Sequence, residues 1–234
     1  MKSSWTQLKT ASGVMRVYMS GPDGAGPFPG VVVIHNQGGL ADILHIADQI
    51  AGAGYVAAAP DMYYRDGIGC QDAPPTRRAR LRDVTVVQDV NATVDLLKEQ
   101  REVDMGRLGI LGFCMGGRVT YLMAAANSGF KAAVMYYGGG IFRAWGDRRS
   151  PFDQTAAIHC PMMGHFGEQD ENPSPEDMRK LDAELTKHDK LHEFYSYGGA
   201  GHAFMNKTRD THRQHAAEAS WPRTVEFFAK HLAG

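Results

Sequence analysis

The stretch Leu108-Gly109-Ile110-Leu111-Gly112-Phe113-Cys114-Met115-Gly116-Gly117 decides how this chain of 234 residues folds. The apolar run at 108–111 predicts a buried strand, and a cysteine with glycines two positions before and after it predicts a sharp turn into a helix. Only small neighbours fit such a tight backbone, and the turn presents the cysteine side chain above the edge of a sheet. At a helix N-terminus, the macrodipole and free N–H groups favour a negatively charged sulfur. The stretch therefore predicts a nucleophilic cysteine.

On either side of this turn, apolar strands alternate with helical segments. Two short strands at 5–10 and 14–19 predict an N-terminal antiparallel hairpin, and further strands are expected at 31–35, 55–59, 132–137, 161–166 and 193–197. Helices are expected at 41–53, 76–99, through 121–126, and at 176–187 and 212–230. This alternation predicts an α/β fold with a mostly parallel central sheet and helices on both faces. No repeat or linker divides the chain, so one domain is expected over 1–234.

The composition narrows the range of functions. Hydrophobic residues at 43% and charged residues at 22% are ordinary for a soluble globular protein, and a net charge of −1 gives no basic excess for binding nucleic acid. The three cysteines form neither a disulfide framework nor a spacing typical of metal ligands. No signal peptide or apolar run long enough for a bilayer is present, so we expect a cytoplasmic protein without a membrane partner.

A cysteine nucleophile needs a base within hydrogen-bond reach and a carboxylate that orients this base. In α/β-hydrolases the order along the chain is nucleophile, acid, histidine. Asp170 follows the strand expected at 161–166, at the sheet edge where open α/β sheets place their sites. His202 lies in a glycine-rich loop between the last strand and the last helix. Order and position therefore predict a triad of Cys114, Asp170 and His202.

Other readings of these residues remain open at this point. Glu168 and Glu171 are close to Asp170 in sequence, and either could supply the carboxylate. A lone cysteine is often a small buried hydrophobe, which is the role expected for Cys70 and Cys160. Most of the ten histidines are expected to be solvated, and only chain order and the glycine loop single out one of them.

Motifs spread along nearly the whole chain carry a resemblance to a known family. They are Val-Val-Ile-His at 32–35 followed by Gly39-Leu40, Gly-Phe-Cys-Met-Gly-Gly at 112–117, Tyr-Tyr-Gly at 136–138, Gly-x-x-Asp at 167–170 and Gly-His-Ala-Phe at 201–204. In these motifs the chain resembles the dienelactone hydrolase (carboxymethylenebutenolidase-like) family of α/β-hydrolases. The resemblance implies hydrolysis of a small ester or lactone through an acyl-enzyme, with no metal or organic cofactor.

The resemblance also implies a role for each site residue. His202 would deprotonate the thiol of Cys114 and later activate water, while Asp170 orients the imidazole. The backbone N–H groups of Met115 and Gln37 would receive the oxyanion.

Two positions depart from the family pattern. Members that open dienelactones carry a glutamate after the third-strand histidine, where this chain has Asn36, which cannot accept a proton. Those members also hold a substrate carboxylate with an arginine four residues after the catalytic histidine, where this chain has Asn206. Arginines near loops that could cover the site are other candidates for binding an anion: positions 65, 77, 78, 80, 82 and 143. Asn36 keeps open the alternative of a ligand-binding or regulatory protein with weak or no activity. The low pKa expected for the cysteine keeps open that of a thiol redox sensor.

Several side chains are candidates for lining the substrate pocket, because tyrosine pairs an apolar ring with a polar tip and amides form hydrogen bonds. They are Asn36, Tyr63, Tyr64, Phe113, Tyr137 and Asn206. Core packing is an equal expectation for Tyr137. The expected partner is a small-molecule ester or lactone, and the expected assembly is a monomer or homodimer.

Overall fold

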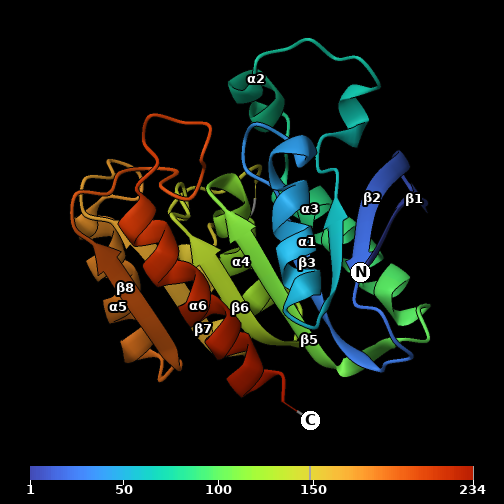
Figure 1. Ribbon diagram of the computed structural model, residues 1–234. Helices are drawn as coiled ribbons and strands as arrows, with labels where there is room; N and C mark the ends of the chain where they lie inside the picture. The colour runs from blue at the N-terminus through green and yellow to red at the C-terminus, as the bar shows by residue number, and fades with distance from the viewer. Residues whose placement is uncertain (148, 234) are drawn as a thin grey trace.

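One sheet with helices on both faces organises the molecule (Figure 1). The computed structural model describes residues 1–147 and 149–233, and within them the sheet has eight strands in the order β1-β2-β4-β3-β5-β6-β7-β8. The strands are β1 Lys2–Thr10, β2 Gly13–Gly21, β3 Phe28–Ile34, β4 Val56–Pro60, β5 Val103–Phe113, β6 Phe130–Tyr136, β7 Met162–Gly167 and β8 His192–Tyr197. The β1–β2 hairpin is antiparallel, and β2 also pairs with β4 in antiparallel orientation. The remaining neighbours, from β4 through β3, β5, β6 and β7 to β8, pair in parallel. The predicted α/β fold with a mostly parallel sheet is confirmed.

The helices cover both faces of the sheet, as the alternation of strands and helices predicts. Their bounds are α1 Leu44–Gly52, α2 Pro74–Ala79, α3 Asp83–Lys98, α4 Met115–Ala126, α5 Pro175–Lys187 and α6 Gln214–His231, with short 3-10 turns at Leu40–Ile43, Tyr64–Asp66 and Phe152–Ala157. Val31 and Val33 of β3 belong to one buried cluster with side chains of α1 and α6, whereas Val32 and Ile34 belong to another with side chains of α3, α4 and α5. All four β3 residues are fully buried, which explains the unbroken apolar run in the sequence.

The prediction of one continuous helix over 76–99 is wrong. The chain forms α2, leaves helical geometry at Arg82 with φ −129° and ψ 137°, and begins α3 at Asp83. Leu81 turns into the core at the break, and the buried Asp83 carboxylate accepts hydrogen bonds from Arg118 at 2.6 and 3.0 Å. A partner 35 positions away in sequence fixes this break. Local helical periodicity therefore could not reveal it.

The carboxyl ends of the parallel strands meet at one edge of the sheet, where open α/β sheets place their sites. The loops that follow β3, β5, β7 and β8 all open at this edge. Within the described residues, no helix combines the length and apolar character that crossing a membrane requires.

Glycines let α4 lie directly against the main chain of the sheet. A Cβ atom on Gly112 would lie 2.1 Å from the Gly116 carbonyl oxygen, and one on Gly116 would lie 2.3 Å from the Ile34 oxygen. A Cβ atom on Gly117 would lie 2.8 Å from the Gly138 Cα atom. Each obstacle is backbone, which cannot yield as the end of a flexible side chain can. The turn between β5 and α4 therefore depends on these glycines.

Replacing Gly112 by alanine tests this dependence. We expect Gly112→Ala to lower the free energy of unfolding by about 3 kcal/mol or more, because the added methyl group overpacks a backbone contact. Gly52→Ala is the matched control, because a Cβ atom there meets nothing within 4 Å and alanine favours a helix by up to about 1 kcal/mol. Urea unfolding of both variants gives the comparison. Equal stability of the two would contradict the packing argument.

Candidate active site

Cys114 occupies the turn between β5 and α4, where the sequence places it. Its backbone has φ 55° and ψ −116°, a region that non-glycine residues rarely adopt and that costs on the order of 1–3 kcal/mol. The Cys114 N–H group donates to the Tyr136 carbonyl at 3.0 Å, and the Arg118 N–H group donates to the Cys114 carbonyl at 3.2 Å. These bonds fix the strained backbone and present the thiol at the carboxyl edge of the sheet.

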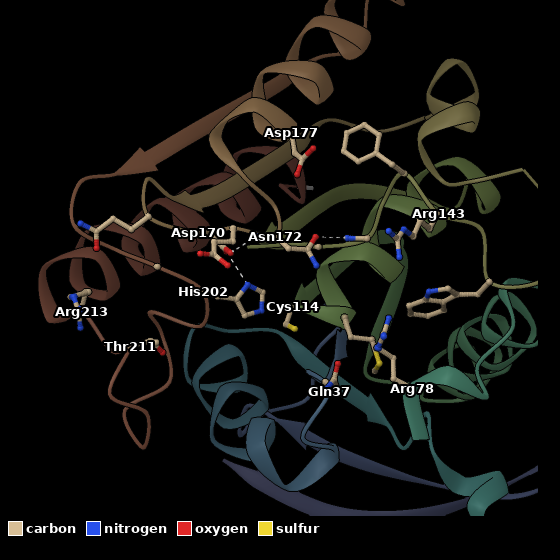
Figure 2. A pocket seen from close by; sticks show the side chains of 18 residues that line it. Gln37, Arg78, Cys114, Arg143, Asp170, Asn172, Asp177, His202, Thr211 and Arg213 are labelled. Carbon is tan, nitrogen blue, oxygen red and sulfur yellow. Dashed lines mark hydrogen bonds and ion pairs between the residues drawn. The ribbon is translucent and has the colours of Figure 1, made fainter. Parts of the chain in front are cut away.

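His202 lies between the thiol and a buried carboxylate (Figure 2). Its Nδ1 atom is 2.9 Å from Asp170 Oδ2, and the ring lines the same two cavities as Cys114. Asp170 is only 4% exposed, and its other oxygen accepts from the Asn172 N–H group at 2.9 Å. The structure thus brings together the three residues of the predicted triad.

The alternative carboxylates do not reach the imidazole. Both Glu168 and Glu171 are exposed, and the ring nitrogen that a carboxylate would orient is already bonded to Asp170. Among the described residues, no group of three or more His, Cys, Asp or Glu side chains could hold a metal ion.

The electrostatics favour a thiolate beside an imidazolium. Burial by itself would raise the pKa of the Cys114 thiol, but hydrogen bonding and positive charge from His202, with the N–H groups of Met115 and Gln37, lower it below its ordinary value. Burial alone would lower the pKa of His202, but hydrogen bonds to Asp170 and Cys114 raise it to about 10. The two shifts stabilise opposite charges on adjacent atoms.

The loop after β3 brings the Gln37 amide to the sulfur. Tyr63 Oη donates to the Gln37 carbonyl at 3.2 Å, and the Gly38 N–H group donates to Asn36 Oδ1 at 2.6 Å. The side chain of Asn36 is therefore engaged within its own loop. The N–H groups of Gln37 and Met115 both lower the pKa of the Cys114 thiol, and their role as oxyanion donors stays a prediction.

Two cavities meet at Cys114 and His202. The larger, of about 890 Å³, extends over Gln169 and Asn172 toward α2, and its charged or aromatic walls include Arg78, Phe142, Arg143, Trp145, Asp177 and Arg213 (Figure 2). The smaller, of about 360 Å³, extends toward the 3-10 turn at Leu40–Ile43 and is lined by Asn36, Asp42, Tyr137, Asn206 and Arg209, among others. A substrate carbonyl at Cys114 has space on both sides.

Two of the pocket candidates are misplaced by the sequence interpretation. Phe113 is 3% exposed and stacks on Tyr136 with ring centroids 4.7 Å apart, because the strand alternation continues to the last residue before the turn. Tyr64 points away from the cavities and bonds Asp89 at 3.0 Å and Thr10 at 2.7 Å. Its neighbour Tyr63 is the tyrosine that reaches the site.

Among the six arginines proposed as anion ligands, Arg78 and Arg143 line the larger cavity. Arg65 pairs with Asp89, whereas Arg77 and Arg80 pair with Asp66. Arg82 donates to the Ala79 and Leu81 carbonyls. The Arg78 Nε atom is buried without a hydrogen-bond partner among residues 1–147 and 149–233.

Other lining residues were missed by the sequence analysis. They are Asp42, Asn172, Arg209, Thr211 and Arg213. The loop from 203 to 213 folds back until the Arg213 N–H group donates to the Phe204 carbonyl at 3.1 Å. No local sequence pattern predicts that the chain folds back here. The only signal in the sequence is the position of the loop directly after the catalytic histidine.

Comparison with known proteins agrees with the fold and with the family resemblance. The family described as "Dienelactone hydrolase family" matches residues 15–232. A protein of Methylorubrum extorquens named "Putative carboxymethylenebutenolidase" is 32% identical, over 96% of this chain and 80% of that protein. A Bradyrhizobium protein named "Probable 2-oxo-3-(5-oxofuran-2-ylidene)propanoate lactonase" is 31% identical, over 98% of this chain and 95% of that one. The crystal structure of a "Putative Dienelactone Hydrolase" from Klebsiella pneumoniae is 28% identical with a TM-score of 0.91, over 98% of both chains.

The pH dependence of alkylation tests the charge state of the thiol. An ordinary thiol has a pKa of about 8.5, and the pKa of Cys114 is lowered. We therefore expect iodoacetamide to modify Cys114 well below pH 8.5. The alkylation rate should fall only when acid protonates the thiolate. His202→Ala should move the midpoint above the wild-type value, because only the N–H groups of Met115 and Gln37 then oppose the effect of burial. Peptide mass spectrometry separates this site from Cys160, whose pKa burial raises to about 12. A wild-type midpoint at or above 8.5 would exclude the ion pair.

Proposed function

The chain belongs to the dienelactone hydrolase family and is an ester or lactone hydrolase, and from this premise we propose that it opens a small carboxylate-bearing lactone or ester through a thioester on Cys114. The observation that carries the proposal is the position of His202 between Cys114 and the buried Asp170 carboxylate, which lies 2.9 Å from the ring (Figure 2). This is the arrangement that nucleophilic acyl transfer requires.

In the first half of the proposed reaction, the thiolate attacks the substrate carbonyl carbon and forms a C–S bond. The carbonyl electron pair moves to oxygen, where the N–H groups of Met115 and Gln37 receive the negative charge. Each such donor typically stabilises the transition state by about 3–4 kcal/mol. As the intermediate collapses, the C–O bond breaks and the imidazolium of His202 gives its proton to the leaving oxygen. Asp170 keeps the imidazole oriented throughout.

In the second half, His202 is neutral and acts as general base. It removes a proton from a water molecule that attacks the thioester carbon. The C–S bond then breaks, and the electron pair returns to Cys114 as a thiolate beside the protonated imidazole. The carboxylic acid product departs, and for a lactone the hydroxyl group released in the first half remains part of the same molecule.

Asn36 does not prevent this route. A glutamate at this position would serve as a proton acceptor for the thiol, but here hydrogen bonding and charge from His202 already lower the thiol pKa. The Asn36 amide instead supports the Gly38 N–H group. Thiol activation by imidazole alone is therefore the simpler scheme for this chain.

The cationic wall of the larger cavity supports a substrate with a carboxylate. Arg78 and Arg143 line that cavity, and the buried Arg78 Nε atom still has a free donor among the described residues. A guanidinium group binds a carboxylate with charge-assisted hydrogen bonds. The named substrates of the relatives, a carboxymethylene butenolide and an oxofuranylidene propanoate, each carry a lactone and a carboxyl group. We assign the substrate carboxylate to Arg78.

Removing the thiol tests the nucleophile. We expect Cys114→Ala to lower kcat/KM for p-nitrophenyl acetate and for lactones by at least about a thousandfold, and Cys114→Ser to lose most activity. Cys70→Ala is the matched control, since that half-buried cysteine belongs to neither cavity lining. Mass spectrometry of the quenched wild-type enzyme should find the acyl group on the Cys114 peptide. Unchanged turnover by Cys114→Ala would exclude this site.

Replacing the arginine tests the substrate class. We expect Arg78→Met to lower kcat/KM for carboxylate-bearing lactones by about ten- to hundredfold, the value of a charged hydrogen bond of about 1.5–3 kcal/mol, and to spare neutral aryl esters. Arg80→Met is the control from the same segment, because Arg80 pairs with Asp66 and Asp72. An equal loss on neutral esters would contradict the assignment of the carboxylate to Arg78.

A further inference from the structure

His35 is a buried, fully hydrogen-bonded histidine that the proposed reaction does not use. It follows β3 directly and is 0% exposed. Its Nδ1 atom is 2.6 Å from the Asn36 carbonyl oxygen, and its Nε2 atom accepts from the Met62 N–H group at 3.0 Å. The ring also packs against Tyr63, with centroids 5.0 Å apart. Both ring nitrogens thus bind main chain, one in the loop after β3 and one in the loop after β4.

These partners fix the tautomer of the ring. A backbone N–H group can only donate, so Nε2 must carry the lone pair that accepts from Met62. The proton of the neutral ring then resides on Nδ1, which donates to the Asn36 carbonyl. Burial lowers the pKa of His35, which keeps the ring neutral near pH 7.

The hydrogen bond from Nδ1 sets the direction of the next amide. In a trans peptide unit, the carbonyl and the N–H group point in opposite directions. The carbonyl of the Asn36–Gln37 unit faces His35, so its N–H group, that of Gln37, points away from His35. Gln37 lines both cavities together with Cys114, and hydrogen bonding from its N–H group lowers the pKa of the Cys114 thiol. Rotation of this peptide unit would move both groups together, so holding the carbonyl holds the N–H group.

The other hydrogen bonds of this loop hold groups outside the peptide unit: the Gly38 N–H group donates to Asn36 Oδ1, and Tyr63 Oη donates to the Gln37 carbonyl. Gly38 and Gly39 follow the peptide unit, and the Gly39 backbone has φ 111°. The Gly39 N–H group also donates to the Asn36 carbonyl, at a longer 3.2 Å, but it belongs to the same glycine turn. His35 anchors the unit to the rigid end of β3 instead. Oxyanion donors are effective when they need no reorganisation during the reaction.

We propose that His35 is a positioning residue for the oxyanion hole: its Nδ1–H group holds the Asn36 carbonyl so that the Gln37 N–H group faces the reacting oxygen. The inference rests on the proposed function, because it gives this N–H group its catalytic role. It adds a residue that touches neither substrate nor sulfur and acts through the neighbouring peptide bond.

Two substitutions of similar severity separate positioning from stability. In His35→Asn, the side-chain amide nitrogen takes the place of Nδ1 and still donates to the Asn36 carbonyl, whereas the acceptor for Met62 is lost. In His35→Leu, both hydrogen bonds are lost at a similar side-chain volume. Both variants leave the buried Met62 N–H group unpaired, so we expect both to melt below the wild type.

The kinetics should nevertheless differ. We expect His35→Leu to lower kcat for p-nitrophenyl acetate by about ten- to hundredfold with little change in KM, because a donor used mainly in the transition state is misplaced. His35→Asn should recover kcat to within about threefold of the wild type. The alkylation midpoint of Cys114 should rise in the leucine variant and stay in the asparagine variant, since the same N–H group donates to the thiolate.

A second buried histidine supplies the control. His165 is also 0% exposed and bonds Tyr197 and Thr224 beneath α6. His165→Leu should lower the melting temperature without changing kcat or the alkylation midpoint.

The inference is overturned if His35→Leu keeps wild-type kcat, or if His35→Asn loses as much kcat as His35→Leu. Either result could occur while Cys114→Ala still abolishes turnover, in which case only the role of His35 fails. Should Cys114→Ala remain active, the proposed function itself would fail.

Discussion

Direct contact between the main chain of α4 and the main chain of the sheet is the constraint on which the rest of this structure depends. Glycines at 112, 116 and 117 remove the side chains that would otherwise separate the helix from β3, β5 and β6. The helix N-terminus therefore lies within the sheet edge instead of above it. This closeness presses Cys114 into a left-handed backbone conformation and brings its thiol level with the loops after β3 and β8. The cost of the strained residue is offset by the hydrogen bonds on either side of it.

The charges of the site follow from this placement. A thiol buried among apolar groups would remain protonated, but at this turn it meets an imidazole and two main-chain N–H groups. The imidazole retains its proton because Asp170, itself almost fully buried, faces the opposite nitrogen. Neighbouring charges and hydrogen bonds thus outweigh burial for both Cys114 and His202. A carboxylate at position 36 is not needed to produce the ion pair.

The sequence predicted the parts of the molecule that depend on local patterns. The apolar run at 31–34 and the glycine spacing around Cys114 each identify a backbone geometry by itself, and chain order then finds Asp170 and His202. The features that the sequence could not predict depend on partners distant in the chain, or on which of two adjacent side chains faces the site. Tyr63 and Tyr64 are adjacent, and the turn at Tyr64–Asp66 decides which ring meets Gln37. No pattern in the sequence of the 203–213 segment predicts that the segment folds back over the cavity.

The break between α2 and α3 connects these observations, because one buried ion pair causes it and also shapes the cavity. Arg118 binds Asp83 through two nitrogens, donates to the carbonyls of Gly140 and Arg143, and lies 3.7 Å from the centroid of the Trp145 ring. Burying a guanidinium and a carboxylate costs much of what their attraction returns, so net stability does not account for the pair. The geometric effect of the pair accounts for its presence. Because the ion pair ends α2 before Asp83, the segment that bears Arg78 need not continue in the direction of α3. The same ion pair holds the 140–145 loop on the other side of the cavity. The two arginine-bearing walls of the cavity are thus placed by a residue four positions after the nucleophile.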